Sequence, residues 1–103
     1  MSKFNIIISE HAKNNIDDYI DFIFYEYKSP LTSLRHKEGL IKTINELSKN
    51  ANVYKYCSNK SVTDIYGIFS KRINYKQMAI IFSIYNDTVI IHAVLKQSVI
   101  KGL

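Results

Sequence analysis

The sequence predicts an α+β fold in which two helices pack on one face of a twisted, mostly antiparallel sheet. Three observations lead to this prediction. A short apolar run opens the chain, two amphipathic segments flank Ser29-Pro30, and three β-rich runs occupy the last third. A chain of 103 residues can bury one core between a sheet and a layer of helices. We therefore interpret residues 1–103 as a single domain.

The first two elements are a strand and a helix. Phe4–Ile8 is too short for a helix and is typical of a strand. Ser9 can cap a helix that begins at Glu10, because its hydroxyl accepts a hydrogen bond from a backbone N–H of the first turn. Apolar residues recur along this helix at intervals of three and four, namely Ala12, Ile16, Tyr19, Ile20, Ile23 and Tyr27. Three more aromatic residues, Phe22, Phe24 and Tyr25, widen the apolar sector, so part of it packs on the second helix or on a partner.

The second helix follows Ser29-Pro30, because a residue before proline is disfavoured in the α region. It is expected from Leu31 or Ser33 to Lys49, antiparallel to the first. Its inward residues are Leu34, Leu40, Ile41, Ile44 and Leu47, and its outward residues are Arg35, His36, Lys37 and Lys42. The outward cations form either a solvated face or a phosphate contact. Residues 50–63 lack periodicity and are expected to be an irregular loop.

An antiparallel meander is expected from Ile65–Ile73, Met78–Tyr85 and Thr88–Leu95. The two-residue turn Asn86-Asp87 sets the last hairpin, with Tyr85 opposite Thr88, Ser83 opposite Ile90 and Ile81 opposite His92. A four-residue loop at Asn74–Gln77 would place Ile73 opposite Met78, Arg72 opposite Ala79 and Ser70 opposite Ile81.

Because side chains alternate along a strand, this register separates the meander into two faces. The core face collects Ile65, Phe69, Lys71, Ile73, Met78, Ile80, Phe82, Ile84, Val89, Ile91, Ala93 and Leu95. The other face is half apolar and collects Tyr66, Ile68, Ser70, Arg72, Ala79, Ile81, Ser83, Tyr85, Ile90, His92, Val94 and Lys96. Such a mixed face is the expected place for function.

Charge is unevenly distributed along the chain, whose net charge is +5. Residues 1–28 hold three cations and five carboxylates, whereas the rest holds eleven cations and four carboxylates. The basic part is suited to a nucleic acid or another polyanion, or is an ordinary solvated surface. No apolar run is long enough for a membrane span, no signal peptide is recognisable, and the single Cys57 fits a reducing cytoplasm. Phosphate-binding, zinc-protease and serine-hydrolase motifs are absent from the sequence, so we expect neither a metal nor another cofactor.

Three segments carry a resemblance to a known family. They are FNIIISEHAKNNIDDYIDFI (residues 4–23), LIKTINELSKN (residues 40–50) and FSKRINYKQMAIIFSIYNDTVIIHAVL (residues 69–95). In order and spacing they resemble the opening strand and first helix, the second helix and the meander of the RelE/ParE superfamily of bacterial toxin–antitoxin toxins. The resemblance implies a cytoplasmic toxin that inhibits growth and is neutralised by a cognate antitoxin. A homodimer and a heterotetramer with the antitoxin are both compatible with it.

The resemblance leaves the target open. Members of the RelE branch cut messenger RNA on the ribosome without a metal, whereas members of the ParE branch inhibit DNA gyrase without cutting anything. A detoxified member that only binds a partner is a further alternative. Arg72 matches an arginine of the nuclease branches, whereas Met78 and the tail KQSVIKGL (residues 96–103) depart from their pattern.

For the nuclease alternative, three residues of the mixed face are the catalytic candidates. RNA cleavage needs a base, an acid and cations that stabilise the charge on the phosphate. Arg72 and Lys96 would supply the cations, and His92 has the ordinary pKa suited to proton transfer. Alternatively, His92 is a partly buried, hydrogen-bonded sheet histidine. Arg72 is alternatively an ion-pair partner of an acidic antitoxin tail or of a carboxylate at a helix end. The expected substrate-binding residues around them are Tyr66, Lys71, Tyr75, Lys76 and Tyr85.

Overall fold

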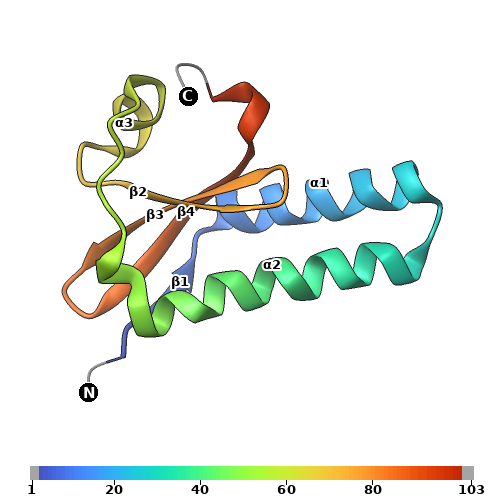
Figure 1. Ribbon diagram of the computed structural model, residues 1–103, viewed down its shortest axis with the longest axis horizontal. Helices are drawn as coiled ribbons and strands as arrows, with labels where there is room; N and C mark the ends of the chain where they lie inside the picture. Colours follow the sequence, from blue (N-terminus) through green and yellow to red (C-terminus); the bar gives the residue numbers. More distant parts are fainter. Residues whose placement is uncertain (1–2, 101–103) are drawn as a thin grey trace.

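The computed structural model describes residues 3–100, which form a four-stranded sheet with a helical hairpin on one face (Figure 1). In chain order the elements are β1 (Asn5–Ile8), α1 (Glu10–Tyr27), α2 (Pro30–Asn50), the 3-10 helix η1 (Ala51–Val53), α3 (Lys60–Tyr66), β2 (Lys71–Tyr75), β3 (Met78–Tyr85), β4 (Thr88–Lys96) and the 3-10 helix η2 (Gln97–Val99). The expected α+β fold, with its N-terminal strand, helical hairpin and antiparallel meander, is confirmed.

The strand order in the sheet is β1-β4-β3-β2. Strand β1 pairs in parallel with β4, and the other two pairings are antiparallel. The hydrophobic strands β3 and β4 are therefore central, which explains why β3 has five fully covered residues in succession from Met78 to Phe82. The first strand of the chain thus lies beside the last.

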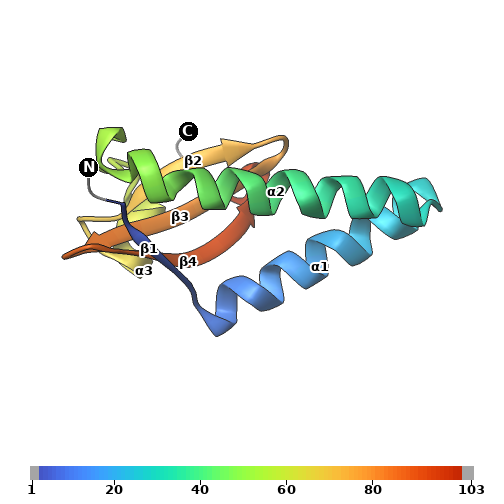
Figure 2. The same cartoon turned by 90° about the horizontal axis from the view of Figure 1, so that it is seen from below.

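Both helices of the hairpin begin with a serine cap, and the cap at Ser9 was predicted from the sequence. The Ser9 hydroxyl accepts a hydrogen bond from the Ala12 N–H at 3.0 Å, and the Ser29 hydroxyl accepts one from the Thr32 N–H at 3.2 Å. Pro30 occupies the first turn of α2, where its missing N–H costs nothing. Figure 2 shows that the hairpin extends well beyond the edge of the sheet, so its far end is not covered by any strand.

The main core lies between this hairpin and the sheet. Its buried members are Ala12, Ile16, Tyr19, Ile23, Leu40, Ile44, Leu47, Ala51, Met78, Ile80, Phe82, Val89, Ile91 and Val94. Tyr19 also bonds the two helices together, since its hydroxyl oxygen lies 2.8 Å from His36 Nδ1. Burial raises the pKa of Tyr19 to about 12 and lowers the pKa of His36, so at neutral pH the hydrogen bond joins a protonated tyrosine to an uncharged imidazole.

The prediction of a strand over Ile65–Ile73 is wrong in its first half, and residues 50–63 are not wholly irregular. Residues 60–66 form helix α3, which ends at Gly67 with φ 102°, and strand β2 begins only at Lys71. Asn59 caps α3 by accepting a hydrogen bond from the Ser61 N–H. The sequence did not predict this helix for two reasons. Its β-branched residues are typical of a strand, and it buries only Val62 and Tyr66, which lie one turn apart and give no repeating pattern.

The last hairpin has the expected turn but contains a β-bulge. Tyr85 pairs with Thr88 and Ser83 pairs with Ile90, as predicted. The expected pairing of Ile81 with His92 is wrong, because Ile81 pairs with Ala93 and Phe82 pairs with Ile91. His92 is the extra residue of the bulge. Beyond it every side chain of β4 changes sides relative to the prediction.

Strands β2 and β3 are joined by the two-residue turn Lys76-Gln77 instead of a four-residue loop. Arg72 therefore pairs with Ile81, and Tyr75 pairs with Met78. The observed register differs from the predicted one by two residues. Since side chains alternate with a period of two, each β2 residue keeps its predicted face.

Candidate functional site

The face of the sheet opposite the hairpin, here called the α3 side, is partly covered and contains a second hydrophobic core. Helix α3 and the end of the chain cover its centre, where Val62, Ala79, Ile81, Ala93 and Ile100 are buried together. Figure 1 shows α3 and η2 on this side and the hairpin on the other. The mixed face expected from the sequence is therefore closed in the middle, and its polar residues lie at the margins.

Arg72 lies at one margin, in a polar cleft of about 380 Å³. Its Nε donates to Asn74 Oδ1 at 2.8 Å, and its Nη2 donates to Gln97 Oε1 at 3.4 Å. The cleft is lined by Lys55, Tyr56, Cys57, Ser58, Asn59, Arg72 and Asn74. Two cations and no carboxylate line it, so it is suited to a phosphate or carboxylate group.

His92 lies elsewhere on the α3 side, in the middle of β4 and against α3. Its Nε2 is 2.7 Å from Ser83 Oγ, and its ring stacks on Tyr66 with 6.1 Å between centroids. Its backbone carbonyl accepts a hydrogen bond from the Ser9 hydroxyl at 3.1 Å. Burial lowers the pKa of His92 below its usual value of 6.5, so the ring is uncharged at neutral pH. An uncharged imidazole can act as a proton acceptor.

Lys96 lies on the hairpin side of the sheet, against the prediction. Its Nζ is 4.2 Å from the centroid of the Phe22 ring on α1. It lines a hollow of about 300 Å³ together with Asp18 and Tyr19. The bulge at His92 accounts for this change of side, so Lys96 does not share a face with Arg72.

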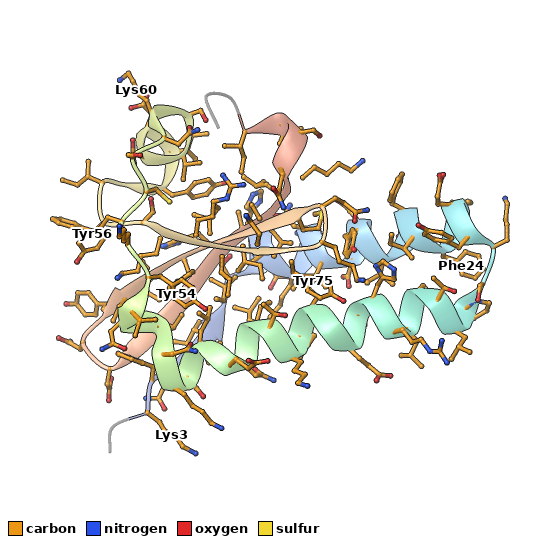
Figure 3. All side chains as sticks on the ribbon, in the orientation of Figure 1. Lys3, Phe24, Tyr54, Tyr56, Lys60 and Tyr75 are labelled. Atoms are coloured by element: carbon orange, nitrogen blue, oxygen red, sulfur yellow. The ribbon has the colours of Figure 1, made fainter. Side chains whose placement is uncertain are left out.

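The five predicted substrate-binding residues are also dispersed. Tyr66 stacks on His92, and Tyr85 is exposed beside the Asn86-Asp87 turn. Lys71 is buried, where its Nζ donates to the Tyr54 carbonyl and lies 4.6 Å from the centroid of the Tyr56 ring. Tyr75 points toward α2 (Figure 3), and the exposed Lys76 lies near its ring.

The Arg72 cleft is lined by neither His92 nor Lys96, and the hollow lined by Lys96 includes neither Arg72 nor His92. The sequence placed Arg72 and His92 on one face, and both do lie on the α3 side. Strand β3 and the second core separate them, however. The three candidates thus belong to three different environments.

Sequence reasoning missed two groups of residues in these environments. Ser83 was assigned to the correct face, but its bond to His92 was not foreseen because the bulge was not foreseen. Ser58 and Asn59 line the Arg72 cleft from a segment without periodicity, which the bridge between Tyr56 and Lys71 and the bond from Lys71 Nζ to the Tyr54 carbonyl hold against the sheet. The sequence signal that could have indicated this cleft is a run of polar loop residues shortly before a strand that carries a cation, Arg72.

No group of three or more metal-ligating side chains occurs in the part of the chain that the structure describes. In the same part, no helix has the length and apolarity needed to cross a membrane.

No protein-family model matches the sequence, and no curated protein sequence matches it. Solved structures do match. A chain from the chromosomal ParDE TA system of P. aeruginosa superposes with a TM-score of 0.73 at 10% identity, covering 91% of this chain and 96% of that chain. The chain has the RelE/ParE toxin fold.

A second solved structure supports this RelE/ParE assignment of the fold. A chain of the toxin–antitoxin complex RelBE2 from Mycobacterium tuberculosis superposes with a TM-score of 0.61 at 13% identity, covering 91% of this chain and 98% of that chain. The superposed RelE/ParE-fold region includes nearly all of both chains. The fold expected from the three sequence segments is therefore found, although sequence identity is low.

Proposed function

We propose that this protein is the toxin of a type II toxin–antitoxin pair, that it acts in the cytoplasm, and that it inhibits its target by binding without catalysis. The toxin role is supported by the fold, which it shares with chains of the ParDE and RelBE2 toxin–antitoxin systems. The non-enzymatic mechanism is supported by the positions of the candidate catalytic residues.

The observation that carries the mechanism is the separation of Arg72, His92 and Lys96. Metal-independent RNA cleavage needs the base, the cations and the acid within reach of one phosphate. Lys96 lies on the hairpin side, and Arg72 and His92 are separated by the second core. A gyrase inhibitor of the ParE type has no need for such a constellation. DNA gyrase is therefore the target that we propose.

Ribosome-dependent cleavage of messenger RNA is the second candidate. The observation in its favour is the pairing of an uncharged His92 with Ser83 under the Tyr66 ring, which provides a proton acceptor and a surface on which a base can stack. The basic cleft around Arg72 would then hold the RNA backbone at a distance from His92.

The Arg72 cleft also supports a cognate antitoxin as partner. Its two cations lack a carboxylate partner within the cleft, and an acidic segment of an antitoxin would supply one. Binding there would cover the most concentrated polar site on the α3 side. This proposal concerns neutralisation, and it holds for either target.

The deciding experiment is induced expression in a bacterial host, followed by two measurements in the same culture. Loss of negative supercoiling in a reporter plasmid, with no new messenger RNA ends in primer extension, is the result expected of a gyrase inhibitor. New RNA ends with normal supercoiling would replace this mechanism with the nuclease. Normal growth at full expression would contradict the toxin role and leave a partner-binding member of the fold.

A further inference from the structure

The outer surface of the α1–α2 hairpin, which faces away from the sheet, carries an apolar stripe. The opposite surface of the hairpin, which faces the sheet, is identified by one residue on each helix. Asn15 on α1 accepts a hydrogen bond from the Val94 N–H, and Gly39 on α2 contacts Tyr75. Phe24 lies nine residues after Asn15, which is about 180° around a helix. Leu34 lies five residues before Gly39 and is rotated from it by roughly 140° around the helix axis. Ile41 lies two residues after Gly39 and is rotated by roughly 160°. We call Ile20, Phe24, Leu34 and Ile41 the hairpin stripe.

The hairpin stripe is not covered by any other element of residues 3–100. Phe24 is 43% exposed and Leu34 is 50% exposed, and Figure 3 shows Phe24 near the end of the hairpin that is remote from the sheet. Ile20 and Ile41 are partly buried against the main core and continue the stripe toward the sheet. An apolar stripe of this kind along two adjacent helices is typical of a packing surface.

The two helices that flank the stripe carry opposite net charge. Helix α1 contains Glu10, Asp17, Asp18, Asp21 and Glu26 but only Lys13 as a cation, whereas α2 contains Arg35, Lys37, Lys42 and Lys49 against Glu38 and Glu46. These charges do not neutralise one another within the hairpin, because the one salt bridge among the described residues joins Lys60 to Asp64. When two copies of such a surface are related by a two-fold rotation, the acidic helix of each copy can lie against the basic helix of the other.

The heights of the residues along the hairpin allow this pairing. The bond between Tyr19 and His36 places these two residues at the same height, and the helices run antiparallel from there. Counting along the two helices from this pair, Phe24 is level with Leu31 and Asp21 is level with Leu34, so Leu34 and Lys37 lie about 4.5 Å beyond those two levels. In a dimer whose two-fold axis runs parallel to the helices, α1 of one copy lies on α2 of the other at the same height. Phe24 then lies within one helical turn of Leu34 of the second copy, and Asp21 lies within one turn of Lys37.

We propose that the protein forms a homodimer through the hairpin stripe, with the two hairpins making an antiparallel four-helix bundle and the two sheets lying outside it. The occupant of the stripe is a second copy because the stripe and its flanking charges are self-complementary under this rotation. The proposal is independent of the proposed function, since it uses no residue of the Arg72 cleft or the His92 pair.

Sedimentation of the protein made by cell-free synthesis, over a wide concentration range, tests the proposal. The expected species at high concentration has twice the monomer mass of 12.0 kDa. Leu34→Asp should leave only monomer, whereas Ile65→Asp, at a 72% exposed position on α3, should leave the dimer intact. A wild-type protein that remains monomeric throughout, or a Leu34→Asp dimer as strong as wild type, would overturn the proposal. Circular dichroism of both variants checks that the fold is retained.

A charge exchange tests the pairing of α1 with α2. Asp21→Lys and Lys37→Asp should each weaken the dimer about tenfold, because two symmetric attractions become repulsions. The double variant should restore it. A double variant weaker than either single one would contradict the α1-on-α2 arrangement.

Discussion

Ser83 Oγ lies 2.7 Å from Nε2 of His92, the residue at the bulge of β4. The bond joins the two central strands on the α3 side at the point where their ladder is interrupted. Because the pKa of His92 is lowered by burial, protonation of its ring works against the folded state.

The first prediction concerns the pH dependence of folding stability. The pKa of folded His92 lies below the usual 6.5, so the unfolded chain binds more protons as pH falls through this region. Folding stability should therefore decrease from pH 7 toward pH 5. His36, whose pKa is lowered by burial and by Lys76, should act in the same direction. Urea unfolding of wild type, His92→Gln and His36→Gln at several pH values measures the effect.

The expected result is a shallower pH dependence in each single variant than in wild type. A His92→Gln protein with an unchanged slope would show that the ring is not held in its uncharged form. Glutamine is chosen because it retains a polar group that can bond to Ser83.

The second prediction concerns Arg72. Replacing it with alanine should abolish toxicity, because the guanidinium is one of only two cations lining the polar cleft. The protein should remain folded, since only the partly exposed bonds to Asn74 and Gln97 are lost. Plating efficiency after induction, together with thermal unfolding of the purified variant, measures both effects. Lys60→Ala is the control, because its exposed pair with Asp64 lies outside the cleft. Full toxicity of Arg72→Ala would place the functional surface elsewhere.

The third prediction concerns Gly39 in the middle of α2. A Cβ at this position would lie 2.0 Å from Tyr75 Oη, so Gly39→Ala forces the tyrosine or the helix to move. We expect a loss of about 1–3 kcal/mol in unfolding free energy, although alanine normally stabilises a helix relative to glycine. Tyr75→Phe in the same chain should recover part of the loss. A Gly39→Ala protein more stable than wild type in urea would contradict this packing.

The fourth prediction compares two residues of α3. Val62 is 2% exposed and contacts the second core, whereas Ile65 is 72% exposed. Val62→Ala should cost roughly 1–3 kcal/mol, and Ile65→Ala should be nearly neutral. Equal effects of the two substitutions, measured by urea unfolding, would mean that α3 is not packed on the sheet in solution.

The sequence predicted the elements that have a repeating pattern. The two helices, the Ser9 cap and the Asn86-Asp87 turn each depend on residues close together in the chain, and each was predicted correctly. Two residues expected to face inward, Tyr27 and Leu34, are exposed, because they lie at the end of the hairpin that extends beyond the sheet. The β2 register was displaced by two residues, a change that leaves alternation intact, so Arg72 was assigned to the correct side of the sheet.

The remaining features depend on contacts between distant residues. A bulge moves one residue out of a ladder, and nothing in the run TVIIHAVL marks His92 as that residue. Lys96 was consequently assigned to the wrong face of the sheet. Helix α3 has a single turn of buried surface, and its place on the sheet is set by Ala79, Ile81 and Ala93. The side of the sheet was predicted correctly for Arg72 and His92 and wrongly for Lys96, which lies beyond the bulge.

The parallel pairing of β1 with β4 has a consequence for synthesis of the protein. Asn5 is bonded to the far end of the chain through the register with Thr88, and Ser9 bonds to His92, 83 residues later. A growing chain that lacks β4 therefore has no partner for its first strand and no anchor for the start of α1. Contacts that span so much sequence form late and slowly. The sheet should therefore be completed only after β4 has left the ribosome, so a newly made chain lacks the native fold until its synthesis is almost finished.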